Sequence, residues 1–136
     1  MRCAGKAGVV TGTSRGLGRE ILLALAREGA SVVGVARDAQ GGNEGVEEAS
    51  QAGGRAVFQE GDVRREEDVV AGIERCRSEF GTFDFMVNNA GILGEGRLHE
   101  ATNEQWDDLV ATHLTGTFWG CKHAVNAMRE TGRAGS

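Results

Sequence analysis

The residues best suited to chemistry in this chain are three glycines near its N-terminus, Gly12, Gly16 and Gly18. An apolar run, residues 7–10, precedes them, and an apolar-periodic segment begins at Leu17, so the glycines lie where a strand turns into a helix. Gly12 allows a tight turn, Gly16 lets the backbone approach a ligand, and Gly18 lets the helix pack close to the strand. Because the free N–H groups and the dipole of a helix N-terminus favour an anion, this spacing predicts a phosphate-binding turn.

Two arginines lie where they can contact a phosphate. Arg15 is inside the glycine turn, and Arg37 follows a small and β-branched run, residues 30–36, that predicts a second strand. In dinucleotide-binding folds an acid at the end of this strand holds a ribose 2′-hydroxyl, whereas an arginine there accommodates a 2′-phosphate. Ala36 occupies the acid's place, and a guanidinium offers paired donors in one plane, so the arginines favour NADP(H) over NAD(H). Asp38 is the residue that would favour NAD(H), and ordinary surface arginines are the alternative interpretation.

The elements that must position these residues follow from the periodicity of the apolar residues. Strands are predicted at residues 7–10, 30–36, 56–58 and 83–87, and helices at residues 17–27, 46–52, 66–80 and 102–128, with a loop at 39–45. This alternation predicts an α/β fold, a doubly wound parallel sheet of the Rossmann type with strand order 3-2-1-4 and helices on both faces. A ligand cleft is expected where that order reverses, outside the carboxyl ends of strands one and four.

Composition limits the class of protein. With 136 residues, 40% of them hydrophobic, the chain is expected to form one domain, residues 1–136, with a buried core. Its net charge of −5, from 15 basic and 20 acidic residues, argues against a nucleic-acid or anionic membrane partner. Cys3, Cys76 and Cys121 lie far apart, which favours a reducing compartment, the cytoplasm, over a disulfide framework or a zinc site. No histidine pair has metal-ligand spacing and no apolar run is long enough to span a bilayer, so we expect neither a metal nor a membrane.

Three motifs in this order resemble the short-chain dehydrogenase/reductase family: Thr11-Gly12-x-x-x-Gly16-x-Gly18, then Asp62-Val63, then Asn88-Asn89-Ala90-Gly91. The resemblance covers essentially the whole chain, and it implies hydride transfer between a nicotinamide dinucleotide and a small carbonyl or alcohol substrate. In that family the glycine turn holds the pyrophosphate, the Asp of the Asp-Val pair contacts the adenine, and the Asn-Asn-Ala-Gly turn braces the sheet beside the cofactor. The resemblance therefore implies cofactor-binding roles for Gly12, Ser14, Arg15, Gly16, Leu17, Gly18, Asp62, Val63, Asn88, Ala90 and Gly91, to which Arg37 is added by its position after strand two.

Two departures from the family pattern bear on catalysis. The family's catalytic set is an Asn after strand four, then a Ser, then Tyr-x-x-x-Lys, and His113 stands at the position that matches the Asn. His113 is thus the one catalytic candidate, although a lone histidine with no carboxylate or nucleophile at matching spacing is more simply structural. The sequence contains no tyrosine and ends at Ser136, where the family's fifth strand would begin. We therefore expect the cofactor-binding half of such a domain, truncated before strand five.

Three functions stay open at this point. The first is the cofactor-binding half of an NADP(H)-dependent oxidoreductase, with enzymatic activity undecided because the Tyr and Lys are absent. The second is a dinucleotide-binding module without chemistry, and the third is an interaction module that pairs through the long C-terminal helix. Self-association is expected, because strand four, residues 83–87, has no fifth strand beside it and leaves an open edge and apolar faces.

Overall fold

A parallel sheet organises the chain, and the computed structural model describes it over residues 1–136. Its strands are β1 (Ala7–Thr11), β2 (Ser31–Ala36), β3 (Arg55–Glu60) and β4 (Phe85–Val87). They lie in the order β3-β2-β1-β4, which confirms the predicted order. Every residue of β1 and β2 is buried, because helices cover both faces of these inner strands.

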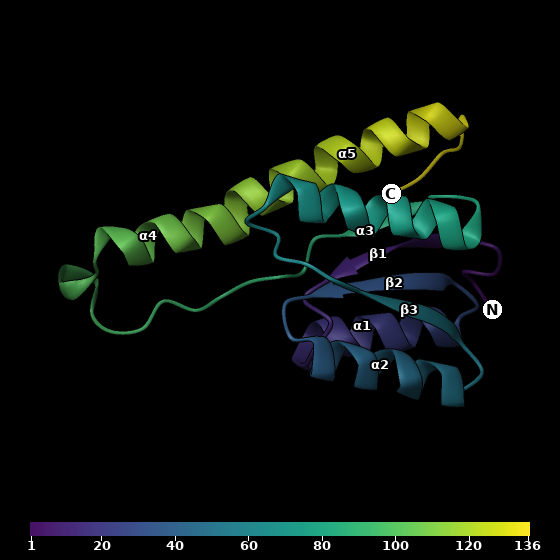
Figure 1. The fold of residues 1–136 in the computed structure, drawn as a ribbon, viewed down its shortest axis with the longest axis horizontal. Coiled ribbons are helices and arrows are strands. Elements are labelled where there is room, and N and C mark those ends of the chain that lie inside the picture. Colours follow the sequence, from purple (N-terminus) through teal and green to yellow (C-terminus); the bar gives the residue numbers. More distant parts are fainter.

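Helices form a layer on each face of the sheet (Figure 1). On one face lie α1 (Gly16–Arg27) and α2 (Ala39–Gln51), and on the other lie α3 (Glu66–Phe80) and α5 (Gly116–Thr131). Side chains alternate along a strand, so Val10 joins the core with Leu22 of α1, whereas Val9 joins the core with Ile73 of α3. The buried sheet therefore holds the ends of its strands in fixed positions.

Helix α2 differs from the prediction, which places a loop at residues 39–45 and a short helix after it. The helix begins at Ala39, because the Asp38 carboxylate caps it by accepting a hydrogen bond from Gly41 N at 3.2 Å. Glycine is a poor helix former, but a Cβ on Gly42 would overlap the ring of Phe58. Close packing of α2 on the sheet therefore outweighs the low helix propensity of its first turn.

The predicted helix over residues 102–128 is divided by a change of helical pitch. A short 3₁₀ turn, η1 (Leu98–Glu100), precedes α4 (Asn103–Leu109), and the π-helical turn η2 (Val110–Thr115) joins α4 to α5. A capping box begins α4, with Gln105 N donating to Thr102 Oγ1 and Thr102 N donating to Gln105 Oε1. Helix α4 projects beyond the sheet and packs on no helix or strand other than η2 (Figure 1).

Strand β4 is shorter than the predicted residues 83–87, and its outer edge is partly paired. After α5 the chain turns back at Gly132, which has φ +66° and ends the helix in the left-handed conformation. Ser136 N then donates to Asp84 O and Met86 N donates to Ser136 O, both at 3.0 Å, as in a parallel pair of strands. The expected open edge of strand four is therefore occupied at Met86 by Ser136.

A buried carboxylate ties together the end of the sheet opposite the carboxyl ends of the strands. Asp84 is 3% exposed and accepts hydrogen bonds from Ala7 N (2.9 Å), Arg133 Nε (2.9 Å) and Lys6 Nζ (3.4 Å). Burial alone would raise the pKa of the Asp84 carboxyl, but these hydrogen bonds outweigh burial and hold that pKa below its usual value. Asp84 thereby links the segment before β1 to the segment after α5.

We expect Asp84→Asn to lower the free energy of unfolding at pH 7 by about 1–3 kcal/mol, because Arg133 and Lys6 lose their charged partner. A carboxylate whose pKa falls on folding stabilises the protein above its unfolded-state pKa, near 3.9, and loses that effect as the pH falls through the folded-state pKa. The difference between wild type and variant should therefore narrow below about pH 4 in urea unfolding curves. Asp107→Asn is the control, since Asp107 is exposed. An Asp84→Asn effect of equal size at all pH values would contradict this role.

Candidate functional site

A cleft of about 750 Å³ lies outside the carboxyl ends of β1 and β4, where the strand order reverses. The turns that follow all four strands contribute to it, together with η2. Its lining consists of Gly12, Ser14, Arg15, Gly16, Leu17, Gly18, Val35, Ala36, Arg37, Asp38, Gly61, Asp62, Val63, Asn89, Ala90, Gly91, Ile92 and Thr112. The structure therefore brings together every predicted cofactor-binding residue except Asn88.

The turn between β1 and α1 requires glycine at two positions. Gly12 has φ +76°, a left-handed conformation that residues with a side chain rarely adopt. A Cβ on Gly18 would overlap the backbone oxygen of Gly12, so only glycine lets α1 begin this close to the end of β1. No side chain caps the first turn of α1 and no acidic residue lies in it, so its N–H groups have no side-chain partner. This helix N-terminus therefore fits an anion, in agreement with the glycine spacing.

Hydrogen bonds between Thr11 and Asn89 join the turn after β1 to the turn after β4. Asn89 Nδ2 donates to Thr11 O at 2.9 Å, while the N–H groups of Asn89 and Ala90 donate to Thr11 Oγ1 at 3.1 and 3.0 Å. Thr11 is 2% exposed while Asn89 and Ala90 are half-buried, so these hydrogen bonds are partly shielded from water. They hold the two walls of the cleft close together, and a Cβ on Gly12 would lie 2.8 Å from Ala90 Cα.

The two asparagines of the Asn-Asn-Ala-Gly turn point in opposite directions. Asn88, which sequence reasoning places at the cofactor, lies against α5, where its Nδ2 is 3.6 Å from Cys121 Sγ and a Cβ on Gly120 would overlap its Oδ1. Asn89, which sequence reasoning does not single out, lines the cleft instead. Successive residues at a strand end point to opposite sides, so the alternation of side chains along β4 is the signal that distinguishes the two asparagines.

The other lining residues that sequence reasoning does not select are Val35, Ala36, Asp38, Gly61, Ile92 and Thr112. Most of them are small or apolar and carry no recognisable motif. Asp38 and Ala36 enter the prediction only as residues that bear on the choice between two cofactors. Among these residues only Asp38 carries a charge, and its carboxylate accepts a hydrogen bond from Gly41 N.

Positive charge at the cleft comes from Arg15 and Arg37, which are both exposed. Neither guanidinium forms a hydrogen bond or ion pair in the structure, unlike Arg64 and Arg65 nearby. Asp38, the residue that would favour a ribose hydroxyl, has its carboxylate on Gly41 N at the start of α2. The cleft therefore combines a helix N-terminus with two cations that have no acidic partner, an arrangement suited to an anion with several phosphate groups.

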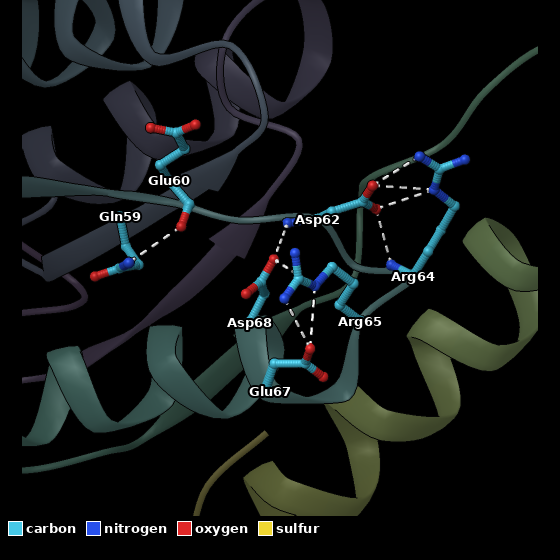
Figure 2. Close-up of polar contacts among 7 residues, drawn as sticks. All are labelled: Gln59, Glu60, Asp62, Arg64, Arg65, Glu67 and Asp68. Atoms are coloured by element: carbon cyan, nitrogen blue, oxygen red, sulfur yellow. Dashed lines mark hydrogen bonds and ion pairs between the residues drawn. The ribbon is translucent and has the colours of Figure 1, made fainter.

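Asp62 presents a strongly held carboxylate at the cleft (Figure 2). Its backbone N–H donates to Asp68 Oδ2 at 2.9 Å, which fixes the turn after β3. Arg64 Nη2 donates to Asp62 Oδ2 at 2.7 Å, and Arg64 N donates to Asp62 Oδ1 at 2.9 Å. The hydrogen bonds from Arg64 hold the pKa of the Asp62 carboxyl below its usual value, against the opposing effect of partial burial. Asp62 is therefore an ionised hydrogen-bond acceptor at neutral pH.

His113 lies on η2 and contacts the loop after Gly91 rather than the cleft. Its Nε2 is 2.7 Å from the Ile92 carbonyl oxygen and 3.1 Å from the Ile92 amide nitrogen. A Cβ on Gly91 would lie 2.7 Å from His113 Cε1, so the ring packs directly against the cleft wall from outside. No carboxylate contacts the ring, and this geometry supports the structural interpretation of His113.

Other chemistry-bearing groups are dispersed. No group of three His, Cys, Asp or Glu side chains is close enough to hold a metal ion. Cys76 is buried, which raises the pKa of its thiol to about 12 and leaves it without nucleophilic character at neutral pH. Of the helices, none has both the length and the hydropathy of a membrane span.

The family model of short chain dehydrogenases matches residues 6–136. Glucose 1-dehydrogenase 2 of Bacillus subtilis strain 168 is 39% identical over 134 residues, which cover 97% of this chain and 52% of that protein. The crystal structure of a short-chain type dehydrogenase/reductase from Mycobacterium marinum superposes with a TM-score of 0.93 at 30% identity, covering 98% of this chain and 54% of that one. A metagenomic short-chain oxidoreductase in complex with NADP superposes with a TM-score of 0.89 at 32% identity, covering 98% of this chain and 61% of that one. The chain thus spans about half the length of the curated relatives it matches.

We expect Asn89→Ala to lower the free energy of unfolding by about 1–3 kcal/mol, because Thr11 O loses its side-chain donor in a buried position. Asn88→Ala is the matched control, since the neighbouring asparagine makes only a weak contact with sulfur. The Asn88→Ala substitution should lower the free energy of unfolding by less than about 1 kcal/mol. Urea unfolding of both variants measures the two costs, and equal costs would contradict the distinct role of Asn89.

Proposed function

The chain belongs to the short-chain dehydrogenase family, and from this premise we propose that residues 1–136 form one dinucleotide-binding domain whose cleft takes NADP(H). The observation that carries the proposal is the first turn of α1, which has no side-chain cap and lies in a cleft beside the unpaired Arg15 and Arg37. The metagenomic relative in complex with NADP supports it further. A cleft of about 750 Å³ is within the size range of sites for small-molecule cofactors.

The residues present fit such a cofactor part by part. The backbone N–H groups at Gly16, Leu17 and Gly18 take the pyrophosphate, because they are free donors at the positive end of a helix dipole. The Asp62 carboxylate accepts a hydrogen bond from the amino group of the adenine, and the guanidinium groups of Arg15 and Arg37 donate to the 2′-phosphate. The cleft walls around the cofactor are completed by Ser14, Val63, Ala90 and Gly91.

The activity that we propose for a protein containing this domain is hydride transfer between the nicotinamide and a small carbonyl or alcohol. When bound, the nicotinamide supplies or accepts the hydride. The carbonyl oxygen then needs a proton donor, and general acid catalysis contributes about 10²–10⁴-fold to such a reaction. This chain contains no tyrosine. His113 is proposed to brace the wall at Gly91 and Ile92 rather than to move that proton.

Self-association through the long helix is a second proposal, supported by an apolar face. Trp106, Leu114, Phe118 and Val125 are 66, 69, 60 and 52% exposed, respectively. Their spacing is close to helical repeats, so α4, η2 and α5 present them as a stripe. Exposed apolar stripes of this kind mark protein interaction sites, and a second copy of the chain offers the same stripe.

We expect the chain to bind NADPH more tightly than NADH, and Arg37→Ala to reduce that preference by about tenfold, because a guanidinium is lost from the 2′-phosphate. Titration calorimetry with both dinucleotides measures the preference. Arg27→Ala is the matched control, since Arg27 is exposed at the far end of α1 and lies outside the cleft. Equal affinity for the two dinucleotides, unchanged in Arg37→Ala, would overturn the assignment.

The same samples test the assignment of His113. With ketones, aldehydes or quinones added, the absorbance of NADPH should stay constant, because the chain lacks the family's tyrosine. Turnover that disappears in His113→Ala would show instead that His113 donates the proton.

Sedimentation velocity tests the apolar stripe. We expect the chain to dimerise, and Phe118→Asp to make it monomeric, because a charge on the stripe is costly to bury. Leu93→Asp should leave the dimer intact, since Leu93 is 92% exposed but lies on the loop before η1. A monomer at all concentrations for the wild type argues against this second proposal.

A further inference from the structure

Arg64 makes an unusually complete contact with Asp62 (Figure 2). Its Nε lies 3.1 and 3.0 Å from Oδ1 and Oδ2 of Asp62, and its Nη2 lies 2.7 Å from Oδ2. The backbone N–H of Arg64 donates to Oδ1 as well. Both carboxylate oxygens are therefore held by one residue, and the fork geometry fixes the plane of the carboxylate as well as its charge.

Arg64 contacts Asp62 without bordering the cleft itself. Asp62 lines the cleft and Arg64 does not. The remaining guanidinium nitrogen, Nη1, turns away from Asp62 and donates to Asp108 Oδ1 at 2.8 Å. The three charges thus run from the cleft wall to α4 in the order carboxylate, guanidinium, carboxylate, with Arg64 in the middle.

Asp108 is the one residue of α4 whose side chain forms an ion pair with the body of the protein. Helix α4 packs on no helix or strand besides η2, so this ion pair is its polar link to the turn after β3. One helical turn beyond Asp108 lies Thr112, which lines the same cleft. The link therefore joins two walls of the cleft, at Asp62 and at Thr112.

We propose that Arg64 is a positioning residue for purine recognition: it orients the Asp62 carboxylate toward the amino group of adenine, and Asp108 of α4 anchors it in that position. The inference rests on the proposed function of the cleft. An oriented carboxylate accepts a hydrogen bond from the 6-amino group of adenine. It opposes the 6-oxo group of hypoxanthine, which offers only an acceptor at that position. Arg64 therefore sets the preference for adenine over hypoxanthine without touching either base.

The test compares ADP with IDP, two nucleotides that share the ribose and the pyrophosphate but differ at the purine 6-position. Titration calorimetry on the wild-type chain should give tighter binding of ADP. In Arg64→Ala the ratio of the two affinities should fall by about tenfold, because the carboxylate loses its fixed orientation. If Arg64 served only stability, Arg64→Ala would weaken the binding of both nucleotides equally and leave the affinity ratio unchanged.

Arg65→Ala is the matched control. Arg65 is the next residue, and its guanidinium pairs with Glu67 at 2.9 Å and with Asp68 at 3.8 Å, but makes no hydrogen bond to the Asp62 carboxylate (Figure 2). Its replacement should leave the affinity ratio unchanged. Arg64→Lys should fall between wild type and Arg64→Ala, since an ammonium carries the charge but cannot form the fork.

Asp108→Asn tests the anchor while leaving Asp62 and Arg64 in place. It should lower the affinity ratio by about twofold to threefold, the effect of one partly exposed ion pair. The inference is overturned if Arg64→Ala has a native circular dichroism spectrum and an unchanged affinity ratio. If Arg64→Ala does not fold, an unchanged affinity ratio in Asp108→Asn overturns it instead. A wild-type chain that binds neither nucleotide overturns the proposed function of the cleft as well, so the two failures are distinguishable.

Discussion

The hydrogen bonds between Thr11 and Asn89 are the interaction on which the rest of the site depends. Parallel strands end at the same edge of a sheet, but that alone leaves the turns after β1 and β4 free to separate. The Asn89 side chain and two backbone N–H groups converge on the buried Thr11, in a position partly shielded from water. They fix the distance between the glycine turn and the Ala90 wall, and so they determine the width of the cleft.

Charge organises the two ends of the sheet differently. At the end away from the cleft, the buried Asp84 carboxylate forms ion pairs with Lys6 and Arg133, which compensate its negative charge. At the cleft, Arg15 and Arg37 have no such partners, and the first turn of α1 lacks a cap. Because both guanidinium groups are exposed and form no ion pair, they are free to contact an anionic ligand, and this difference separates the structural end of the sheet from the binding end.

Much of the fold follows from periodicity alone, because strand and helix repeats and the glycine positions are properties of local sequence. The order of the strands and the place of the cleft follow in turn from the alternation of elements. Three features depend on tertiary contacts that cannot be predicted from local sequence. Helix α2 keeps glycine in its first turn because Gly42 packs closely on Phe58, and η2 interrupts a helix whose residues give no sign of it. The asparagine that faces the cleft is Asn89 rather than Asn88, a choice made by the orientation of β4.

A dinucleotide bound across the start of α1 and the Asn89 wall would contact backbone amides on both sides of the cleft. The most direct measurement is a titration of the ¹⁵N-labelled chain with NADPH, followed in amide correlation spectra. We expect the amide signals of Gly16, Leu17, Gly18 and Ala90 to shift together and saturate with one binding curve. Signals that stay unmoved at these residues, or shifts confined to α4 and α5, would contradict it.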